Sequence, residues 1–226
     1  MNNRLLAVIT PLSGYLVDKD TVVLTEKFVE GMKVYADYWK GPVKVIAHSG
    51  VDTTGNLDHR RYKIDDLPFD VALINFNNFA LIIKEIENAD VVLGGSIHYL
   101  NGIAEYCRNN QIVYVHCSEY TLKTRWQIVN ASTTNPIKRL KNYLWEWNQE
   151  RKNKNEIKLS AAIQCNGAPV YEQYKEINKD CMLYFDNRIT EESLAATSEL
   201  PPLPNQFDHK RPIQLAFSGR LNRACS

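Results

Sequence analysis

Short apolar runs that alternate with longer stretches of helical spacing constrain the fold of this chain more than any other feature. The apolar runs cover residues 5–9, 43–47, 71–74, 91–93 and 112–115. Continuous apolar runs are typical of parallel strands that are buried on both faces. Because right-handed crossovers join such strands, the pattern predicts an α/β fold with a Rossmann-like, doubly wound, mainly parallel sheet.

The segments between these runs predict the helices and one long loop. Residues 21–39 have helical spacing, and the helical face would carry Leu24, Phe28, Met32 and Tyr35. Shorter helices are predicted over residues 79–87 and 101–108. Residues 52–66 are polar and rich in turn formers, which predicts a loop.

The second half of the chain predicts a long amphipathic helix. Asn135 and Pro136 are a capping residue and a proline at the first helical position. Apolar side chains follow at helical spacing, interleaved with lysine and arginine: Ile137, Leu140, Leu144 and Trp147. One interpretation is a cover helix that packs on the sheet through this apolar face. The other is membrane-surface contact, with Trp145, Trp147 and the lysines against anionic headgroups.

Beyond this helix the pattern returns to strands. A strand is predicted over residues 157–163, a helix over 170–177 and a strand over 182–185.

Composition excludes several classes of function. The 226 residues are 44% hydrophobic and 23% charged, with a net charge of +1, so the chain has no nucleic-acid signature. The first apolar run is too short for a signal peptide or a membrane span. The five cysteines are scattered without metal-type spacing, which indicates reduced thiols. We therefore expect a cytoplasmic protein without a metal site or a nucleic-acid partner; peripheral membrane contact stays an alternative.

The candidate site residues follow the predicted strands, because ligands of doubly wound folds bind beyond the carboxyl ends of the strands. Ser13 and Gly14 follow the first run, where a glycine lets a ligand approach the backbone closely. The alternative for this pair is an ordinary tight turn. Asn166 and Gly167 follow the strand predicted over 157–163 and are further candidates for substrate binding.

His116 and Glu119 lie at the end of the fifth run. A histidine near pKa 6.5 exchanges protons at neutral pH, so His116 is the candidate catalytic residue. Its alternative role is that of a hydrogen-bonded core histidine. Glu119 is a candidate for orienting an acceptor hydroxyl, or it is a solvated carboxylate. His98, at the end of the preceding run, is a weaker candidate.

The end of the chain predicts the start of a second domain. An apolar run over residues 215–217 leads into Gly219 and Arg220, a strand followed by a glycine turn and a cation. Proline-rich residues 198–211 are typical of a linker. We therefore expect a first domain over residues 1–197 and, over 212–226, the first strand of a truncated second domain.

These motifs, in this order, resemble the GT-B glycosyltransferases, in particular the retaining, nucleotide-sugar-dependent glycosyltransferase family four. Residues 9–14 are similar to the first strand and glycine loop of that family. Residues 115–118 are similar to its strand-end histidine motif, and residues 217–221 to the Gly-Arg-Leu that opens its donor domain. The planar guanidinium of Arg220 suits a diphosphate.

The resemblance implies the acceptor-side half of a GT-B fold. The complete enzyme would transfer a hexose from a nucleotide sugar to a polysaccharide or lipid-linked acceptor, without a cofactor. His116 would contact the donor sugar, Ser13 and Gly14 would line the cleft, and Gly219 and Arg220 would contact the donor diphosphate. The chain departs from the family where Cys225 and Ser226 replace its Lys-Gly. We therefore expect no transferase activity from this chain alone.

Other classes of function fit the same pattern. A sugar-nucleotide epimerase of the same architecture is one alternative, and a non-catalytic module that binds glycan or lipid is another. A Rossmann oxidoreductase ranks last, because the G-x-G-x-x-G fingerprint is absent from the sequence.

Overall fold

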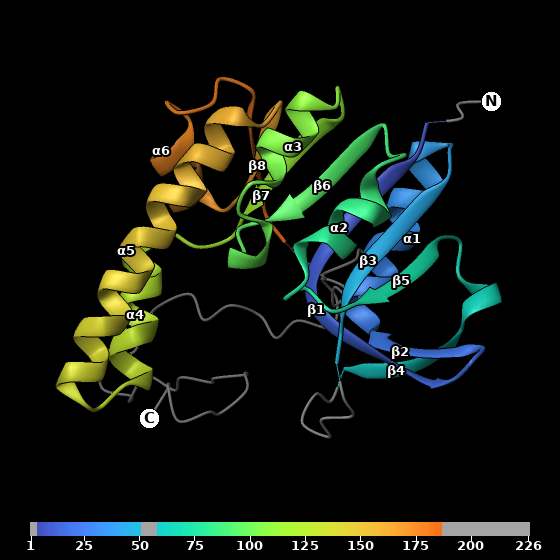
Figure 1. Cartoon of the computed structure of the whole chain (residues 1–226), viewed down its shortest axis with the longest axis horizontal. Helices are drawn as coiled ribbons and strands as arrows, with labels where there is room; N and C mark the ends of the chain where they lie inside the picture. Colours follow the sequence, from blue (N-terminus) through green and yellow to red (C-terminus); the bar gives the residue numbers. More distant parts are fainter. Residues whose placement is uncertain (1–3, 51–57, 187–226) are drawn as a thin grey trace, which may run out of the picture.

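The computed structural model describes residues 4–50 and 58–186, and over these residues nine strands form one twisted sheet with helices on both faces (Figure 1). The strands are β1 (Leu6–Asp18), β2 (Thr21–Thr25), β3 (Val43–Ser49), β4 (His59–Lys63), β5 (Asp70–Ile74), β6 (Val91–Gly95), β7 (Val113–Ser118), β8 (Ala162–Asn166) and β9 (Cys181–Tyr184). The α-helices are α1 (Glu26–Trp39), α2 (Phe79–Ile86), α3 (Ile103–Asn109), α4 (Leu122–Ser132), α5 (Pro136–Leu159) and α6 (Ala168–Tyr174).

The parallel part of the sheet has the order β5-β3-β1-β6-β7-β8-β9. The chain starts at β1 in the middle, moves outward to β5, and then crosses back to β6 on the other side of β1. This is the doubly wound order of a Rossmann-like fold, so the predicted fold class is confirmed. The order reverses between β1 and β6, which is where such folds hold their ligands.

Both faces of the sheet are covered, as the continuous apolar runs predict. Along β1, Ala7 and Ile9 pack in a core cluster with α2 and α3. Leu6 and Val8 point the other way and pack in a second cluster with α1 and β2. Because successive strand residues face opposite sides, each of these four residues is buried against a different layer from its neighbour.

The segment after β1 differs from the sequence prediction. The first strand continues past a register shift between Thr10 and Ser13 as far as Asp18, so the loop expected over residues 11–14, with Ser13 and Gly14, is wrong. Its second half pairs with β2 in an antiparallel hairpin, and β2 pairs with β4. The helix predicted over residues 21–39 therefore begins only at Glu26. The β-branched residues of Thr21–Thr25 favour the strand.

Two other boundaries are corrected. The loop predicted over residues 52–66 contains β4 and the 3₁₀ helix Ile64–Asp66. The strand predicted over 157–163 is displaced, because α5 continues to Leu159 and β8 begins at Ala162. The helix α4 was not predicted from the sequence; it lies beside α5, and the two form a helical pair that extends away from the sheet (Figure 1).

Over residues 137–156, α5 has its polarity reversed relative to the cover-helix interpretation, whereas Ile157 near its end is fully buried in a core cluster with β8 and α6. Ile137, Leu140 and Leu144 are 81%, 60% and 61% exposed. Glu150, Asn153 and Glu156, by contrast, are buried. The interpretation that the apolar face packs on the sheet is therefore wrong. The first half of α5 extends beyond the sheet, and the polar face of α5 turns inward.

Several predictions lie outside the described residues. These are the linker over residues 198–211, the strand over 212–226, and Gly219 and Arg220. Within the described part, the helices include none with the length and apolar character that a membrane crossing requires.

Candidate functional site

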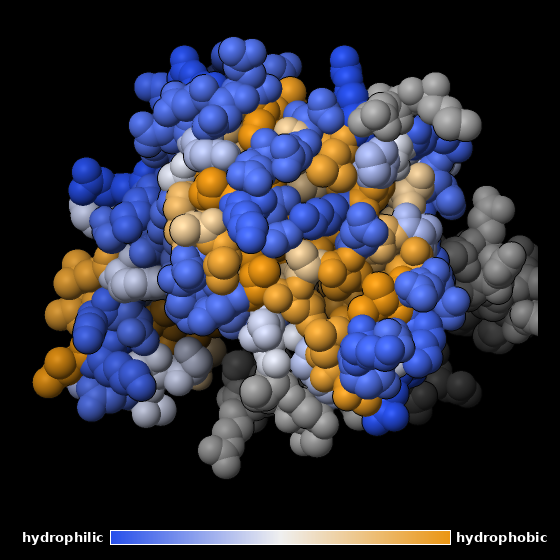
Figure 2. Space-filling view, turned by 45° about the vertical axis from the view of Figure 1, so that its right-hand side comes forward, coloured by the Kyte–Doolittle hydropathy of each residue, from blue (hydrophilic) through white to orange (hydrophobic). Residues whose placement is uncertain are grey.

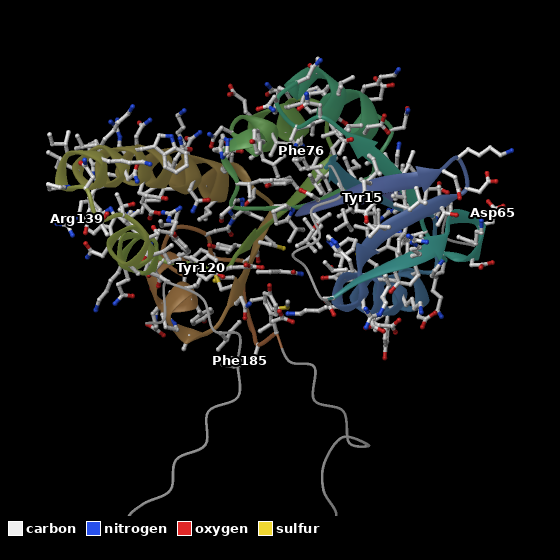
Figure 3. The ribbon with its side chains drawn as sticks, turned by 90° about the horizontal axis from the view of Figure 1, so that it is seen from below. Tyr15, Asp65, Phe76, Tyr120, Arg139 and Phe185 are labelled. Atoms are coloured by element: carbon white, nitrogen blue, oxygen red, sulfur yellow. The ribbon has the colours of Figure 1, made fainter. Side chains whose placement is uncertain are left out.

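The first part of the candidate site is a cavity of about 340 Å³ at the point where the strand order reverses. We call it the switch-point cavity. Its walls are Thr10 and Pro11 of β1, Gly95 of β6, and Glu119 and Tyr120 after β7, and Phe28 and Tyr184 also line it. Figure 3 shows Tyr120 between the helical pair on the left and the sheet on the right.

The second part is a cavity of about 160 Å³ beneath α5, which we call the α5 cavity. Its floor is made by strand-end residues and its cover by the inward face of α5. Residues of both sides line it: Ser96, His98, Asn101, Tyr114, His116, Arg125, Trp145, Glu146, Gln149, Asn153 and Glu156. Ser96 and Arg125 line both cavities, so the two lie side by side.

His116 is held at the floor of the α5 cavity. It is 1% exposed, with Nε2 2.9 Å from the Ser96 hydroxyl oxygen and Nδ1 3.3 Å from the Tyr114 hydroxyl oxygen. Burial lowers the pKa of His116 to about 4, against a smaller raising effect from Asn153. The imidazole is therefore neutral at pH 7. It can donate or accept a hydrogen bond there, but it does not supply a proton as a general acid.

Arg125 stands between the two cavities in a buried ionic cluster. Its Nη2 donates to Glu150, and its Nε lies 3.4 Å from Glu146 Oε2. Glu150 also accepts hydrogen bonds from the Tyr174 hydroxyl, at 3.1 Å, and from Gln173 Nε2, at 3.0 Å. Glu150 thus ties α4 and α6 to α5.

The Nε of Arg125 is buried and, among the described residues, has no hydrogen-bond partner. Next to it, burial raises the pKa of Glu146, while Arg125 opposes that shift and Glu150 adds to it. A buried N–H group without an acceptor is costly in a folded protein. It is the kind of group that a bound oxygen atom would satisfy.

Glu156 lines the same cavity but is occupied structurally. Its carboxylate accepts hydrogen bonds from the Gly102 and Ala104 amides, at 2.7 and 2.9 Å, at the start of α3. Burial raises the pKa of Glu156, and the two amides partly offset that shift. Because both carboxylate oxygens are engaged, this residue positions α3 against α5.

The predicted residues near the first strand lie in β1 itself. Ser13 is exposed and pairs with His48, and it does not line either cavity. A Cβ on Gly14 would lie 2.8 Å from Leu24 Cδ2 and 3.0 Å from the Val23 carbonyl oxygen. The glycine is therefore required by packing of the hairpin against β1.

The remaining predicted residues lie at two other strand ends. Glu119 lines the switch-point cavity. Asn166 Oδ1 accepts a hydrogen bond from the Asp186 amide at 3.2 Å, and Gly167, with φ of 87°, begins α6. Neither Asn166 nor Gly167 lines the two cavities. The structure thus brings His116 and Glu119 to the edge of the sheet near β6, with Asn166 and Gly167 two strand positions further along.

Sequence reasoning missed the α5 contribution to the site. Glu146, Gln149 and Asn153 recur every three or four residues, which places them on one face of a helix. That polar stripe was the available signal. Across the described ranges, no group of three or more histidine, cysteine or acidic residues has the arrangement of a metal site.

Comparisons with known proteins leave the family open. No protein-family model and no curated protein matches the sequence. Among solved structures, UGT2 of Phytolacca americana, complexed with UDP-2fluoro-glucose and pterostilbene, has a TM-score of 0.49 and 8% identity, over 85% of this chain and 55% of that one. A UDP-glucosyltransferase of Polygonum tinctorium has a TM-score of 0.43 and 9% identity, over 82% and 52%.

A protein of another class is similar to the same degree. It is a short-chain dehydrogenase/reductase of Veillonella parvula in complex with NADP, with a TM-score of 0.42 and 14% identity, over 72% of this chain and 68% of that one. The chain spans about half the length of the two plant proteins. Glycosyltransferase family four is not identified by these matches.

Proposed function

We propose that this chain is the acceptor-side lobe of a nucleotide-sugar-dependent glycosyltransferase and that its α5 cavity binds a sugar. The observation that supports this most is the reversed polarity of α5, which turns Glu146, Gln149 and Asn153 toward the cavity and leaves aliphatic side chains outside. A helix that covers a sheet ordinarily turns its apolar stripe inward. The inward polar stripe therefore serves a polar ligand.

The lining matches the chemistry of a sugar. Gln149 and Asn153 carry amides, each with a donor and an acceptor. Gln149 Oε1 accepts from Asn101 Nδ2 at 3.1 Å and Asn153 Nδ2 donates to the Tyr174 hydroxyl at 3.3 Å, so the Gln149 amide nitrogen is the donor that a sugar would engage. A sugar hydroxyl at His116 would replace the contact that its Nε2 makes with Ser96. The Trp145 ring, packed edge to face on His98 at 5.7 Å, adds an aromatic wall. Hydroxyl groups need several such partners to leave water without loss.

The position of the cavities suits transfer to a bound acceptor. The α5 cavity adjoins the switch-point cavity through Ser96 and Arg125. A sugar bound in the α5 cavity would therefore place the group attached to it in the switch-point cavity. In the complete enzyme, cationic groups of a donor-binding lobe would stabilise the leaving diphosphate, the largest catalytic effect. Gly219 and Arg220 are the proposed phosphate contacts. His116 would hydrogen-bond the transferred sugar rather than protonate it.

A dinucleotide-dependent function is less well supported by the backbone. In the Rossmann site the first strand leads through a glycine turn into a helix whose N-terminus binds the pyrophosphate. Here β1 leads into a hairpin, and α1 begins at acidic Glu26. This disfavours the oxidoreductase alternative. A non-catalytic glycan-binding lobe would use the same α5 cavity.

Saturation-transfer NMR with neutral oligosaccharides, UDP-glucose and NAD tests this proposal on the full chain. We expect signals from oligosaccharide, and a loss of affinity of about 5- to 10-fold in Gln149→Ala, since one neutral hydrogen bond is worth about 1 kcal/mol. Gln127→Ala, an exposed amide on α4, is the matched control and should bind normally. Absence of oligosaccharide signals, or equal binding by both variants, would overturn the sugar site.

Two further outcomes separate the classes. Binding of NAD at the strand ends would favour the oxidoreductase alternative over the transferase. Turnover of UDP-glucose by the purified chain would show that it is not one lobe of a two-lobed enzyme.

A further inference from the structure

The outward surface of the α4–α5 pair is aliphatic at the end that lies farthest from the sheet. Ile128 of α4 is 48% exposed, and Ile137, Leu140 and Leu144 of α5 are exposed by more than half. We call these four residues the helical tip. Figure 2 shows hydrophobic atoms projecting at the lower left edge of the molecule, where the α4–α5 pair ends.

The tip does not contribute to the core or to either cavity. Other residues make the inward contacts of this end. The Trp126 and Tyr143 rings pack edge to face at 5.7 Å, Asn142 Nδ2 donates to the Thr133 hydroxyl at 3.3 Å, and the Tyr143 hydroxyl donates to Asn130. Exposing large aliphatic side chains in a cluster is unfavourable in water. The tip is therefore suited to a nonaqueous neighbour.

The charge around the tip is of one sign. The nearby charged side chains are all basic: Lys123, Lys138, Arg139 and Lys141, with Arg125 further inward. From Thr121 to Trp145 the sequence contains no aspartate or glutamate. Figure 3 shows Arg139 at the far end of the helical pair, away from Tyr120 and the sheet. The neighbour that fits this charge is anionic.

We propose that the helical tip docks on an anionic lipid surface. Such a surface satisfies both halves of the patch, because aliphatic side chains enter the boundary between headgroups and acyl chains while lysine and arginine stay with the phosphates. A second copy of this chain fits poorly, because pairing two tips brings cations against cations. Docking does not depend on the sugar site, although it would bring a lipid-linked acceptor to the same helix.

The residues that make this contact differ from those the sequence suggested. Trp145 is 47% exposed, but its ring lines the α5 cavity and lies edge to face on His98 at 5.7 Å. Trp147 is half exposed, but Arg151 stacks over its ring at 5.3 Å, one turn farther from the tip. The aliphatic residues of the tip, rather than the tryptophans, are therefore the inserting groups.

Vesicle co-sedimentation of the full chain tests the proposal. The probes are phosphatidylcholine vesicles with and without phosphatidylglycerol, each at low and high salt. We expect binding only to the anionic vesicles and weaker binding at high salt. The triple variant Lys138→Gln, Arg139→Gln, Lys141→Gln should lose about 100-fold in affinity, since each cation near the surface contributes about fivefold.

Matched variants separate a specific contact from net charge. A triple variant at exposed Lys19, Lys158 and Lys179, each changed to Gln, alters the net charge equally and should bind like the wild type. Leu140→Gln with Leu144→Gln should lose at least about tenfold through lost apolar insertion, whereas Val34→Gln on α1, where Val34 is 54% exposed, should not.

Three results would overturn the proposal. The first is wild-type protein that stays in the supernatant with anionic vesicles. The second is an equal loss in the two lysine and arginine triple variants. The third is a wild-type dimer in analytical ultracentrifugation that Leu140→Gln with Leu144→Gln dissociates, because the tip would then cover a second copy. Circular dichroism checks that each variant is folded.

Discussion

The buried pair of Arg125 and Glu150 should be strongly coupled, and a double-mutant cycle measures that coupling. The side chain of Glu150 is 4% exposed and that of Arg125 is 15% exposed. Removing one member of a buried pair costs about 3–5 kcal/mol when the other charge is left without compensation. Here compensation is partial, because Arg125 Nε also lies 3.4 Å from Glu146 and Glu150 lies 3.6 Å from Lys154 Nζ. We expect the lower end of that range for Glu150→Ala, which also leaves the Tyr174 hydroxyl without its acceptor.

The second single variant should cost less. Arg125→Ala leaves Glu150 with the Tyr174 and Gln173 hydrogen bonds, so we expect about 2 kcal/mol, within the range for a lost hydrogen bond to a charged group. Because both variants remove the same contact, the double variant should cost about 3–3.5 kcal/mol instead of the sum of about 5. The coupling free energy is therefore about 1.5–2 kcal/mol.

Urea unfolding of the four proteins, followed by circular dichroism, measures these free energies. The control is the ion pair between Glu172, in α6, and Lys175, directly after α6. Their side chains are 62% and 35% exposed. The single variants of this pair should be additive within error, because exposed ion pairs contribute little. Additivity of Arg125→Ala and Glu150→Ala within about 0.5 kcal/mol would refute the reasoning that this cluster holds α4 and α6 to α5.

Three further predictions concern packing, titration and capping. Gly14→Ala should destabilise the fold by about 1–3 kcal/mol, because its Cβ would meet Leu24; an unchanged midpoint in thermal unfolding would contradict this. The pKa of His116 is lower in the folded state, at about 4. The contribution of the neutral imidazole to the free energy of unfolding is therefore complete above pH 6.5, and about 3 kcal/mol of it is lost as the pH falls to 4. His116→Gln should therefore flatten the decline in unfolding free energy between pH 7 and 4, and an equal slope in both proteins would be evidence against a buried neutral imidazole. Asn135→Ala should cost about 1 kcal/mol, since the Asn135 side chain caps α5 by accepting from two amides at 3.0 Å; equal stability by urea unfolding would argue against the cap.

The sequence was sufficient for the fold class and for the edge of the sheet that carries the site. Continuous apolar runs require burial on both faces, and this local requirement holds whatever the tertiary details, so the parallel core came out as predicted. The carboxyl ends of those runs also located His116 and Glu119 correctly at the strand ends beside β6. The predicted ends of strands and helices were wrong where a strand continues into a hairpin, as β1 does.

What lies inside and what lies outside was decided only by the tertiary structure. Helical periodicity shows that α5 has a polar and an apolar face, but the environment of each face depends on what packs against it. Here α5 extends past the sheet and covers a cavity, so Gln149 and Asn153 turn inward and Leu140 faces outward. In the same way, the neutral state of His116 results from burial by segments distant in sequence, and no local pattern encodes that burial.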